Sequence, residues 1–416
     1  MSYWPIVKIV AVFLLIIIML RKKVSLDITL LVSTAALGFV FGLGIVPLLK
    51  QLGLTLIAPY TVELISILVL IMVLESVMRQ TGMLQAMTDS LFKFPWNSRL
   101  LIASIPPAII GFLPSAGGAR FSAPLVGQAT LDMSYRAEDK VFINYWFRHV
   151  WEYSLPLYPG LIIAANISGI PVSNLILWLW PFTVIWAALG YFHIWRRYGR
   201  QKDQDHSTGE PGNGAEHGPS CGGTGQSLRE LLANTWPLWS TVVLVLCRVS
   251  IVFTLSGVLC LLIMQKRYSL RAVWKTLTDP LTLRIVFLTW GTMAFKDVLS
   301  ASGAVQQVSG AFSALSIPAL VVVTVLPLAI GMLTGMVQAS IGVSFPLVMG
   351  IIEPSAAYAM LAYVSGVAGV MISPIHLCLI LTIEYFRADF IHSYKPLVAP
   401  TLLMVTAALV MFRLLH

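Results

Sequence analysis

The sequence predicts an all-α membrane protein built from two inverted structural repeats, with about 10 transmembrane helices and two re-entrant hairpins. Three observations predict it: an apolar composition, two hydrophobic segments that are interrupted at equivalent places, and the distribution of basic loops. The 416 residues are 57% hydrophobic and 11% charged, and the mean hydropathy is +0.84. A soluble domain of this size could not bury so much apolar surface, so we expect a polytopic membrane protein.

The first interrupted segment is residues 105–127, IPPAIIGFLPSAGGARFSAPLVG. Its centre, residues 114–118, is a turn sequence, because Pro removes a backbone donor and paired Gly permit positive φ. Each apolar flank is shorter than the roughly 20 helical residues that cross a bilayer. We therefore expect a re-entrant hairpin over 98–130 whose tip lines a site, since irregular backbone at membrane depth needs protein or water around it.

A second segment, residues 326–350, repeats this plan in the sequence LPLAIGMLTGMVQASIGVSFPLVMG. GFLPS at 111–115 aligns with GMLTG at 331–335, and LESVMRQTGML at 74–84 aligns with FKDVLSASGAV at 295–305. A second hairpin is expected over 316–350. Two copies that are broken at the same place indicate the binding site of a secondary transporter.

The membrane segments expected in order define two repeats joined by a polar, Gly-rich and disordered linker. The first repeat, 1–197, has scaffold helices in 3–48 (3–20 and 26–48) and a transport part in 60–195 (60–78, the hairpin, 141–167 and 172–195). The linker covers 198–234. The second repeat, 235–416, has scaffold helices in 235–265 (235–247 and 250–265) and a transport part in 281–414 (281–300, the hairpin, 355–385 and 396–414).

Lys and Arg cluster in the loops 21–23, 79–99, 131–140, 196–202, 266–275 and 387–395. All of these loops fall in the cytoplasm only if 235–265 crosses the membrane twice. Each half then has an odd number of crossings, so the second half is inverted and both termini lie outside. The expected location is the cytoplasmic (inner) membrane, with the linker on the cytoplasmic side.

Composition and motifs also exclude several classes. The net charge of +9 is explained by topology and does not indicate nucleic acid. The four Cys show no ligand spacing, and His206, His217 and Cys221 in the linker are read as a solvated segment in preference to a weak metal site. There is no cleavable signal, no P-loop and no catalytic motif, so we expect no enzyme, no resident metal and no cofactor beyond Na⁺ as a coupling ion.

Each half contains a second broken segment, RHVWEYSLPLYPG at 148–160 and VMISPIHL at 370–377. Pro156 and Pro374 lie inside apolar runs, where proline frees carbonyls that an ion or a buried side chain can satisfy. The alternative is a kink that only shapes packing. Two such prolines beside two hairpins favour a site, with Ser154, Ser373 and His376 next to the breaks.

Ionisable residues in apolar segments are costly and mark interior or interfacial positions. Arg120 follows the first hairpin tip and is the candidate for binding an anion, with a structural bond to hairpin carbonyls as the alternative. Glu75 aligns with Lys296, so the two could pair or could snorkel separately. His149 and Glu152 are candidates for a proton relay or for an ordinary ion pair with Arg148.

The twin hairpins, the FKDVLSASGAV segment and the inverted halves resemble a family of bacterial and archaeal membrane proteins placed in the ion transporter superfamily. The carriers of that superfamily are of the elevator type and include dicarboxylate, citrate and gluconate transporters. The resemblance implies a scaffold domain made of the first two helices of each half, a transport domain that slides against it, and a homodimer through the scaffold. Carboxylate carriers have Ser-Asn-Thr hairpin tips, whereas this chain has PSAGG and LTGM, which argues against a dicarboxylate as the substrate.

Three functions follow as hypotheses. The first is a secondary carrier that moves a small anionic organic solute coupled to Na⁺ or H⁺. The second is a cation/H⁺ antiporter on the same scaffold, and the third is a non-transporting membrane enzyme or assembly factor. The expected solute ligands are Ser115, Gly117, Gly118, Arg120, Thr334, Gly335, Gln338, Ser154, Ser373 and His376, and the expected coupling-ion or proton sites are Glu75, Asp297, Glu152 and His149.

Overall fold

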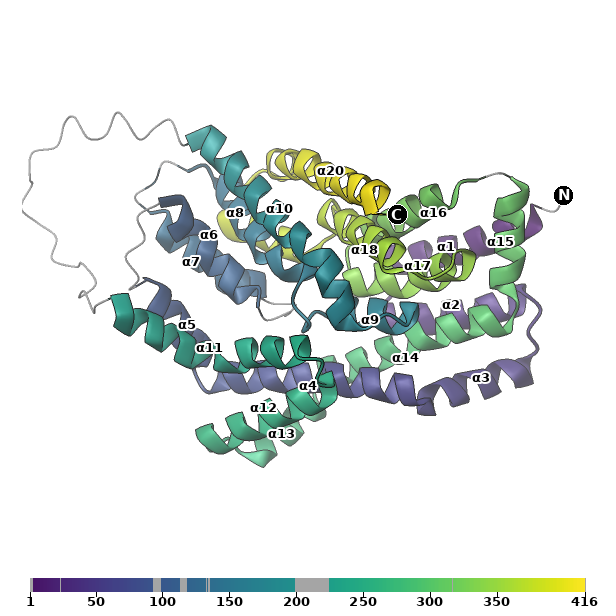
Figure 1. Ribbon diagram of the computed structural model, residues 1–416, viewed down its shortest axis with the longest axis horizontal. Coiled ribbons are helices and arrows are strands. Elements are labelled where there is room, and N and C mark those ends of the chain that lie inside the picture. The colour runs from purple at the N-terminus through teal and green to yellow at the C-terminus, as the bar shows by residue number, and fades with distance from the viewer. Residues whose placement is uncertain are drawn as a thin grey trace, which may run out of the picture.

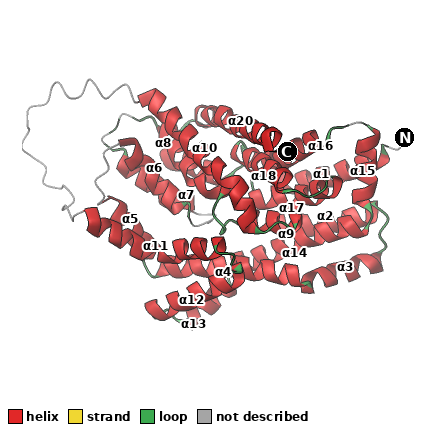
Figure 2. Ribbon diagram, viewed as in Figure 1, coloured by secondary structure: helices red, strands yellow, loops and turns green. Residues whose placement is uncertain are grey.

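The computed structural model describes residues 3–22, 24–92, 99–112, 118–131, 133, 135–198, 224–315 and 317–415. Over these ranges the chain forms helices and contains no β-strand, as Figure 2 shows. The expectation of an all-α protein is confirmed.

The first half contains ten α-helices and one 3₁₀ helix in the described part of the chain. They are α1 (Trp4–Arg21), α2 (Leu26–Val40), α3 (Ile45–Ile57), α4 (Pro59–Gln80), α5 (Met83–Phe92), α6 (Arg99–Ile110), α7 (Gly118–Ala129), α8 (Ala137–Arg148), η1 (Val150–Tyr153), α9 (Pro159–Ser168) and α10 (Val172–Tyr198).

The second half contributes ten further helices within the same described ranges. They are α11 (Thr224–Leu246), α12 (Ile251–Lys266), α13 (Leu270–Leu277), α14 (Pro280–Ala301), α15 (Ala304–Ala314), α16 (Ala319–Thr334), α17 (Val337–Ile351), α18 (Ala356–Met371), α19 (Leu377–Phe386) and α20 (Phe390–Leu415).

Four described helices, α1, α4, α10 and α20, are long and apolar enough to cross a membrane. Nine shorter apolar helices of 10–17 residues accompany them, among them α2, α6, α9, α16 and α17. A 12-residue helix spans about 18 Å, well below the hydrocarbon thickness of about 30 Å. These apolar helices are those of a multi-pass membrane protein.

Several predicted segments are interrupted by local backbone chemistry. The segment expected at 26–48 ends as helix at Val40, because Gly42 takes φ +89° and the chain restarts as α3 at Ile45. The expected segments 141–167 and 355–385 are likewise divided, into α8, η1 and α9 and into α18 and α19. The helix α11 begins at Thr224, so residues 224–234 are helical where the sequence predicted linker.

The long helix α14 packs against α2, α3 and α4, and α4 in turn packs against α12 and α13. At one end of the elongated molecule α5 lies against α11, and at the other end α15 lies against α1 (Figure 1). The helices α6–α10 and α16–α20 gather above this layer in the same view, with α9 and α17 in contact. The interrupted helices therefore lie together on one side of the α4 and α14 layer.

A pair of buried tryptophans joins α8 to α10. The rings of Trp146 and Trp186 stack with centroids 3.8 Å apart and planes at 4°. Each indole N–H donates to the backbone carbonyl of the other residue, both at 2.9 Å. Gly190 allows this approach, since a Cβ there would lie 2.3 Å from the Trp146 ring.

Candidate functional site

The two broken helices of the molecule face each other. The first runs from α8 through η1 to α9, and the second runs from α18 to α19. The Tyr145 hydroxyl donates to the carbonyl of Met371 at 3.1 Å, and the Tyr363 hydroxyl donates to the carbonyl of Glu152 at 2.8 Å. Carbonyls that the breaks leave without helical partners are thus bonded from the opposite half of the chain.

The start of α7 and the turn between α16 and α17 each meet one of these breaks. The helix α7 packs against α6 and begins at Gly118, where a Cβ would lie 2.1 Å from the Arg148 guanidinium. The helix α17 packs against α16 beyond Gly335, which has φ +65°. A Cβ on Gly335 would lie 3.1 Å from the Ser373 Oγ and 3.2 Å from the backbone nitrogen of His376. Gly118 lets the Arg148 guanidinium approach the start of α7 closely, and glycine is favoured at Gly335 both by close approach and by its backbone conformation.

Five buried polar side chains lie at the breaks, beside Gly118 and Gly335, and we call them the central cluster: Arg148, His149, Glu152, His376 and Cys378. The rings of His149 and His376 are edge to face with centroids 5.1 Å apart. Arg148 and His149 are both within hydrogen-bonding reach of the Cys378 thiol. One ligand atom from each of His149, His376 and Cys378 lies within 4.8 Å of the others. Two halves of the chain therefore contribute to one buried, mixed-charge site.

Most of the residues predicted from the two breaks and from the second tip belong to this region. His149 and Glu152 are in the cluster with His376, while Gly335 and Ser373 border it. Thr334 is the last residue of α16, and its hydroxyl donates to the carbonyl of Ile330 at 2.8 Å. Gly118 borders it from the first tip. Gln338 is the second residue of α17 and is partly buried.

Ser115 and Gly117, predicted as ligands, lie outside the described residues. Arg120 occupies the third position of α7, and the structure describes its place on the helix but not its side chain.

Other predicted residues have partners elsewhere. Glu75 forms an ion pair with Arg79 of its own helix, at 2.8 Å. Asp297 accepts hydrogen bonds from the hydroxyls of Thr55 and Tyr60, both at 2.5 Å, so it connects α14 to α3 and α4.

Ser154 lies directly after η1, and its hydroxyl accepts a hydrogen bond from the hydroxyl of Thr183 in α10 at 2.9 Å.

The Lys296 ammonium lies 4.5 Å from the centroid of the Tyr60 ring, and Glu75 forms its ion pair with Arg79. Glu75 and Lys296, which the sequence alignment suggested as a pair, therefore each contact another residue.

Sequence reasoning missed the two residues that give the cluster its character. The sequence offers Arg148 only as a member of a proton relay or of an ion pair with Glu152, and it favours Arg120 as the anion ligand because Arg120 follows the hairpin tip. Cys378 has no neighbouring ligand in sequence. The available signal was positional, since Arg148 directly precedes the first break and Cys378 directly follows the second.

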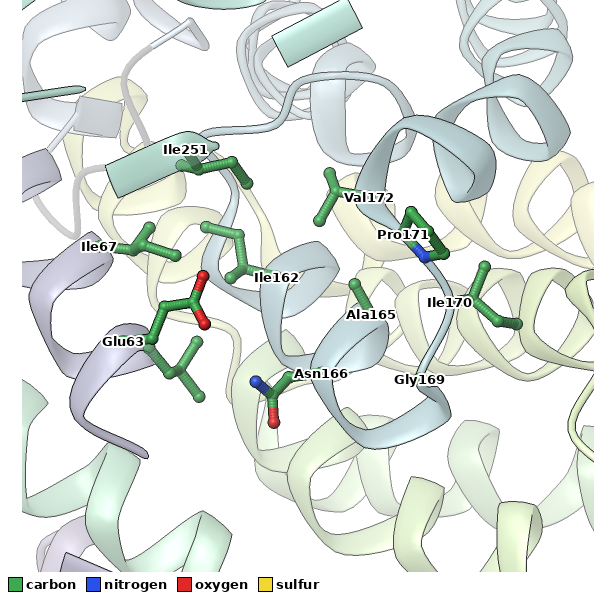
Figure 3. A pocket seen from close by; sticks show the side chains of 11 residues that line it. Glu63, Ile67, Ile162, Ala165, Asn166, Gly169, Ile170, Pro171, Val172 and Ile251 are labelled. Atoms are coloured by element: carbon green, nitrogen blue, oxygen red, sulfur yellow. The ribbon is translucent and has the colours of Figure 1, made fainter. Parts of the chain in front are cut away.

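A separate cavity of about 340 Å³ lies between α4, α9, α10 and α12. Its polar lining comes from Glu63 and Asn166, and apolar residues such as Ile67, Val172 and Ile251 complete it (Figure 3). No member of the central cluster lines this cavity. The chemistry that the sequence indicates is therefore concentrated at the breaks, where the packing is tight.

Comparison with known proteins places the chain without assigning an activity. A family model described as "Protein of unknown function (DUF401)" matches residues 6–207 and 220–415. The short unmatched interval falls inside the predicted linker. No curated protein matches the chain.

Proposed function

We propose that this chain, which belongs to the DUF401 family, is an elevator-type secondary carrier for a small anionic organic solute, coupled to Na⁺ or H⁺. The observation that carries the proposal is the meeting of two broken helices and two helix-pair tips around the buried Arg148. It is proposed as a transporter of the inner membrane and not as an enzyme. The resemblance to the ion transporter superfamily is part of the proposal.

An inverted repeat is supported by the order of the helices. The series α1 to α10 and α11 to α20 have the same plan. In each, a long helix (α4 or α14) is followed by a turn, then by an interrupted helix pair (α6–α7 or α16–α17). A broken helix (α8–α9 or α18–α19) and a long last helix (α10 or α20) complete the series. Gly82 between α4 and α5 has φ +72°, and the aligned Gly303 between α14 and α15 has φ +67°. A duplicated backbone plan accounts for this agreement.

The packing partners also exchange between the halves. Contacts of α2 with α14, α5 with α11, α9 with α17 and α10 with α18 have counterparts in α12 with α4, α15 with α1, α19 with α7 and α20 with α8. A Cβ on Gly111 would lie 2.3 Å from the carbonyl oxygen of Arg148, and a Cβ on the aligned Gly331 would lie 2.4 Å from that of Gly366. This exchange is what a two-fold relation between the halves predicts.

An anionic solute is supported by the chemistry of Arg148. The guanidinium is buried and lies directly against the first residue of α7, so it sits at the amino end of a helix, where backbone N–H groups also favour negative charge. Its planar fork suits a carboxylate or phosphate. The equivalent position in the second half is Gly366, so one half supplies the charge. We accordingly assign the anchoring role expected of Arg120 to Arg148.

Coupling to an ion is proposed to use the same region. Glu152 and His149 are buried beside Arg148, where intramembrane ionisable groups mark proton or ion paths. Carbonyls at the breaks offer oxygen ligands of the kind that bind Na⁺ in broken-helix carriers.

The second candidate, a cation/H⁺ antiporter, is favoured by the buried Glu152 with its neighbouring titratable His149. In that case Glu152 exchanges a proton for a metal cation, and Arg148 only tunes its charge. Asp297 and Glu75 are weaker candidates, because their hydrogen bonds and ion pair lie on α3, α4 and α14.

Transport in proteoliposomes tests both candidates. Purified protein is assayed for uptake of a panel of organic anions under imposed Na⁺ or H⁺ gradients, with Arg148→Lys, Arg148→Gln and Arg79→Gln as variants. The carrier proposal expects gradient-driven uptake of at least one anion that Arg148→Gln abolishes, that Arg148→Lys lowers, and that Arg79→Gln retains. Cation exchange that survives Arg148→Gln and stops in Glu152→Gln identifies the antiporter. A folded protein that moves no solute and no ion under any gradient overturns the proposal.

A further inference from the structure

We infer that His149, His376 and Cys378 form a binding site for a thiophilic metal ion, with Cu⁺ preferred over Zn²⁺. The site bridges the end of the first broken helix and the start of the second. The inference does not rest on the carrier proposal, because it needs only these three side chains and their surroundings.

The geometry is that of a compact three-ligand set. One ligand atom from each residue lies within 4.8 Å of the other two, and all three side chains are buried. Metal–nitrogen and metal–sulfur bonds of about 2.0–2.3 Å bring ligand atoms to within about 4 Å of each other, so a contraction of about 1 Å completes the set. Two imidazoles and one thiolate suit copper and zinc and do not suit Ca²⁺ or Mg²⁺, which prefer oxygen.

The hydrogen bonds of the two histidines leave nitrogen lone pairs for an ion. The Nδ1 of His149 lies 2.7 Å from the carbonyl oxygen of Tyr145, and a carbonyl only accepts, so this nitrogen carries the proton. The Nε2 of the neutral ring then keeps its lone pair. Metal-binding histidines are characteristically oriented by such a bond from the other ring nitrogen to a carbonyl. The Nδ1 of His376 is buried and has no hydrogen-bond partner, which is costly unless a ligand uses it.

Cys378 supplies the soft ligand, and its neighbours decide which ion is favoured. The Arg148 guanidinium lies within hydrogen-bonding reach of the Cys378 sulfur, so the soft ligand sits beside a fixed positive charge. Arg148 also opposes a second cation beside it. Structural Zn²⁺ sites in proteins take four ligands, whereas two imidazoles and one thiolate form the three-ligand set that copper accepts. This ligand number, together with the cationic Arg148 beside the set, favours the monovalent Cu⁺ over Zn²⁺.

The competing cysteines of the chain are removed for the test. Cys247 and Cys260 are exposed, and Cys221 lies in the predicted linker with two histidines. The starting protein is the full chain carrying Cys221→Ser, Cys247→Ser and Cys260→Ser, which keeps Cys378 alone. Binding of Cu⁺ is measured under reducing conditions by competition with a coloured Cu⁺ chelator, and Zn²⁺ is tested in parallel with a zinc indicator.

We expect one Cu⁺ per chain, with affinity reduced at least about tenfold by His376→Ala or by Cys378→Ser. His392→Ala is the matched control, because His392 is exposed and bonds to Asp389 away from the breaks; it should bind as the starting protein does. X-ray absorption of copper bound to the starting protein needs no further variant and should show one sulfur and two imidazole ligands. Absence of stoichiometric Cu⁺ and Zn²⁺ binding, or binding unchanged by both ligand variants, overturns the inference. Tighter binding of Zn²⁺ than of Cu⁺ overturns the preference for Cu⁺.

Discussion

The replacement Gly331→Ala should loosen the packing of α16 against α18. A Cβ at this position would lie 2.4 Å from the carbonyl oxygen of Gly366 and 2.9 Å from the backbone nitrogen of Val370. Both atoms belong to the backbone of a helix, so neither can rotate away as a side chain would. The added methyl group therefore has to push the two helices apart.

The distance sets the size of the effect. Ordinary contacts of a Cβ begin at 3.4 Å, so α16 and α18 must separate by 3.4 − 2.4 = 1.0 Å at this point. Overpacking of this kind costs about 1–3 kcal/mol, and the better helix propensity of alanine returns at most about 1 kcal/mol. We expect a net destabilisation of about 1–2 kcal/mol. The matched control is Gly257→Ala in α12, where nothing lies within 4 Å of the added atom, so only the propensity gain remains.

Thermal unfolding can be followed with a thiol-reactive dye that reports exposure of the buried Cys378, after Cys221, Cys247 and Cys260 are replaced by serine. The Gly331→Ala protein should unfold a few degrees below its parent, and the Gly257→Ala protein at or slightly above it. An unfolding temperature for Gly331→Ala equal to that of the parent would refute the reasoning. An equal drop in the control would show that the loss has another cause.

Three further predictions concern single side chains. Gly118→Ala should displace the Arg148 guanidinium, which lies 2.1 Å from the position of the added Cβ. We expect anion uptake to fall at least about tenfold, because the guanidinium is no longer held in place. The unfolding temperature should change little, because the flexible Arg148 side chain can move. Asp297→Ala should cost about 1–3 kcal/mol, since two hydroxyl donors lose their acceptor, and unchanged uptake in that variant would separate this residue from the site. Asp389 accepts a hydrogen bond from the backbone N–H of His392 at the start of α20, which lowers the pKa of this carboxyl below its ordinary value of 3.8. The stabilisation from this bond is present above about pH 4 and is lost as the pH falls further, so the Asp389→Asn protein should lose less stability than its parent on acidification. Identical acid unfolding profiles of the two proteins would contradict this role of Asp389.

Much of the helical plan could be read from the sequence because its signals are local. The apolar lengths at 60–78 and 172–195 correspond to α4 and α10, and Pro156 and Pro374 lie within two real breaks. The start of α11 at Thr224 was missed, because a Gly-rich polar stretch leading into an amphipathic run gives no sharp boundary. The division of 26–48 is not evident from the sequence, because glycines such as Gly38, Gly42 and Gly44 within an apolar run do not usually end a helix.

The candidate site was predicted only in part, for a physical reason. His149, Glu152 and His376 were found because a charge or imidazole in an apolar segment is costly wherever the chain folds. Cys378 looks like any small apolar residue, and its contact with His149 exists only after two halves of the chain come together. Arg148 was passed over because its value comes from Gly118 lying against it, a contact that no periodicity reveals.

The stacked tryptophans have a mechanical consequence. Pulling α10 away from α8 would break two indole hydrogen bonds at once and uncover two large rings, so these helices travel as one piece whatever else shifts. If the chain is the elevator carrier proposed above, its sliding boundary must therefore run elsewhere than between α8 and α10. The cavity of about 340 Å³ that α12 lines together with α4, α9 and α10 is the place where we would look for that boundary.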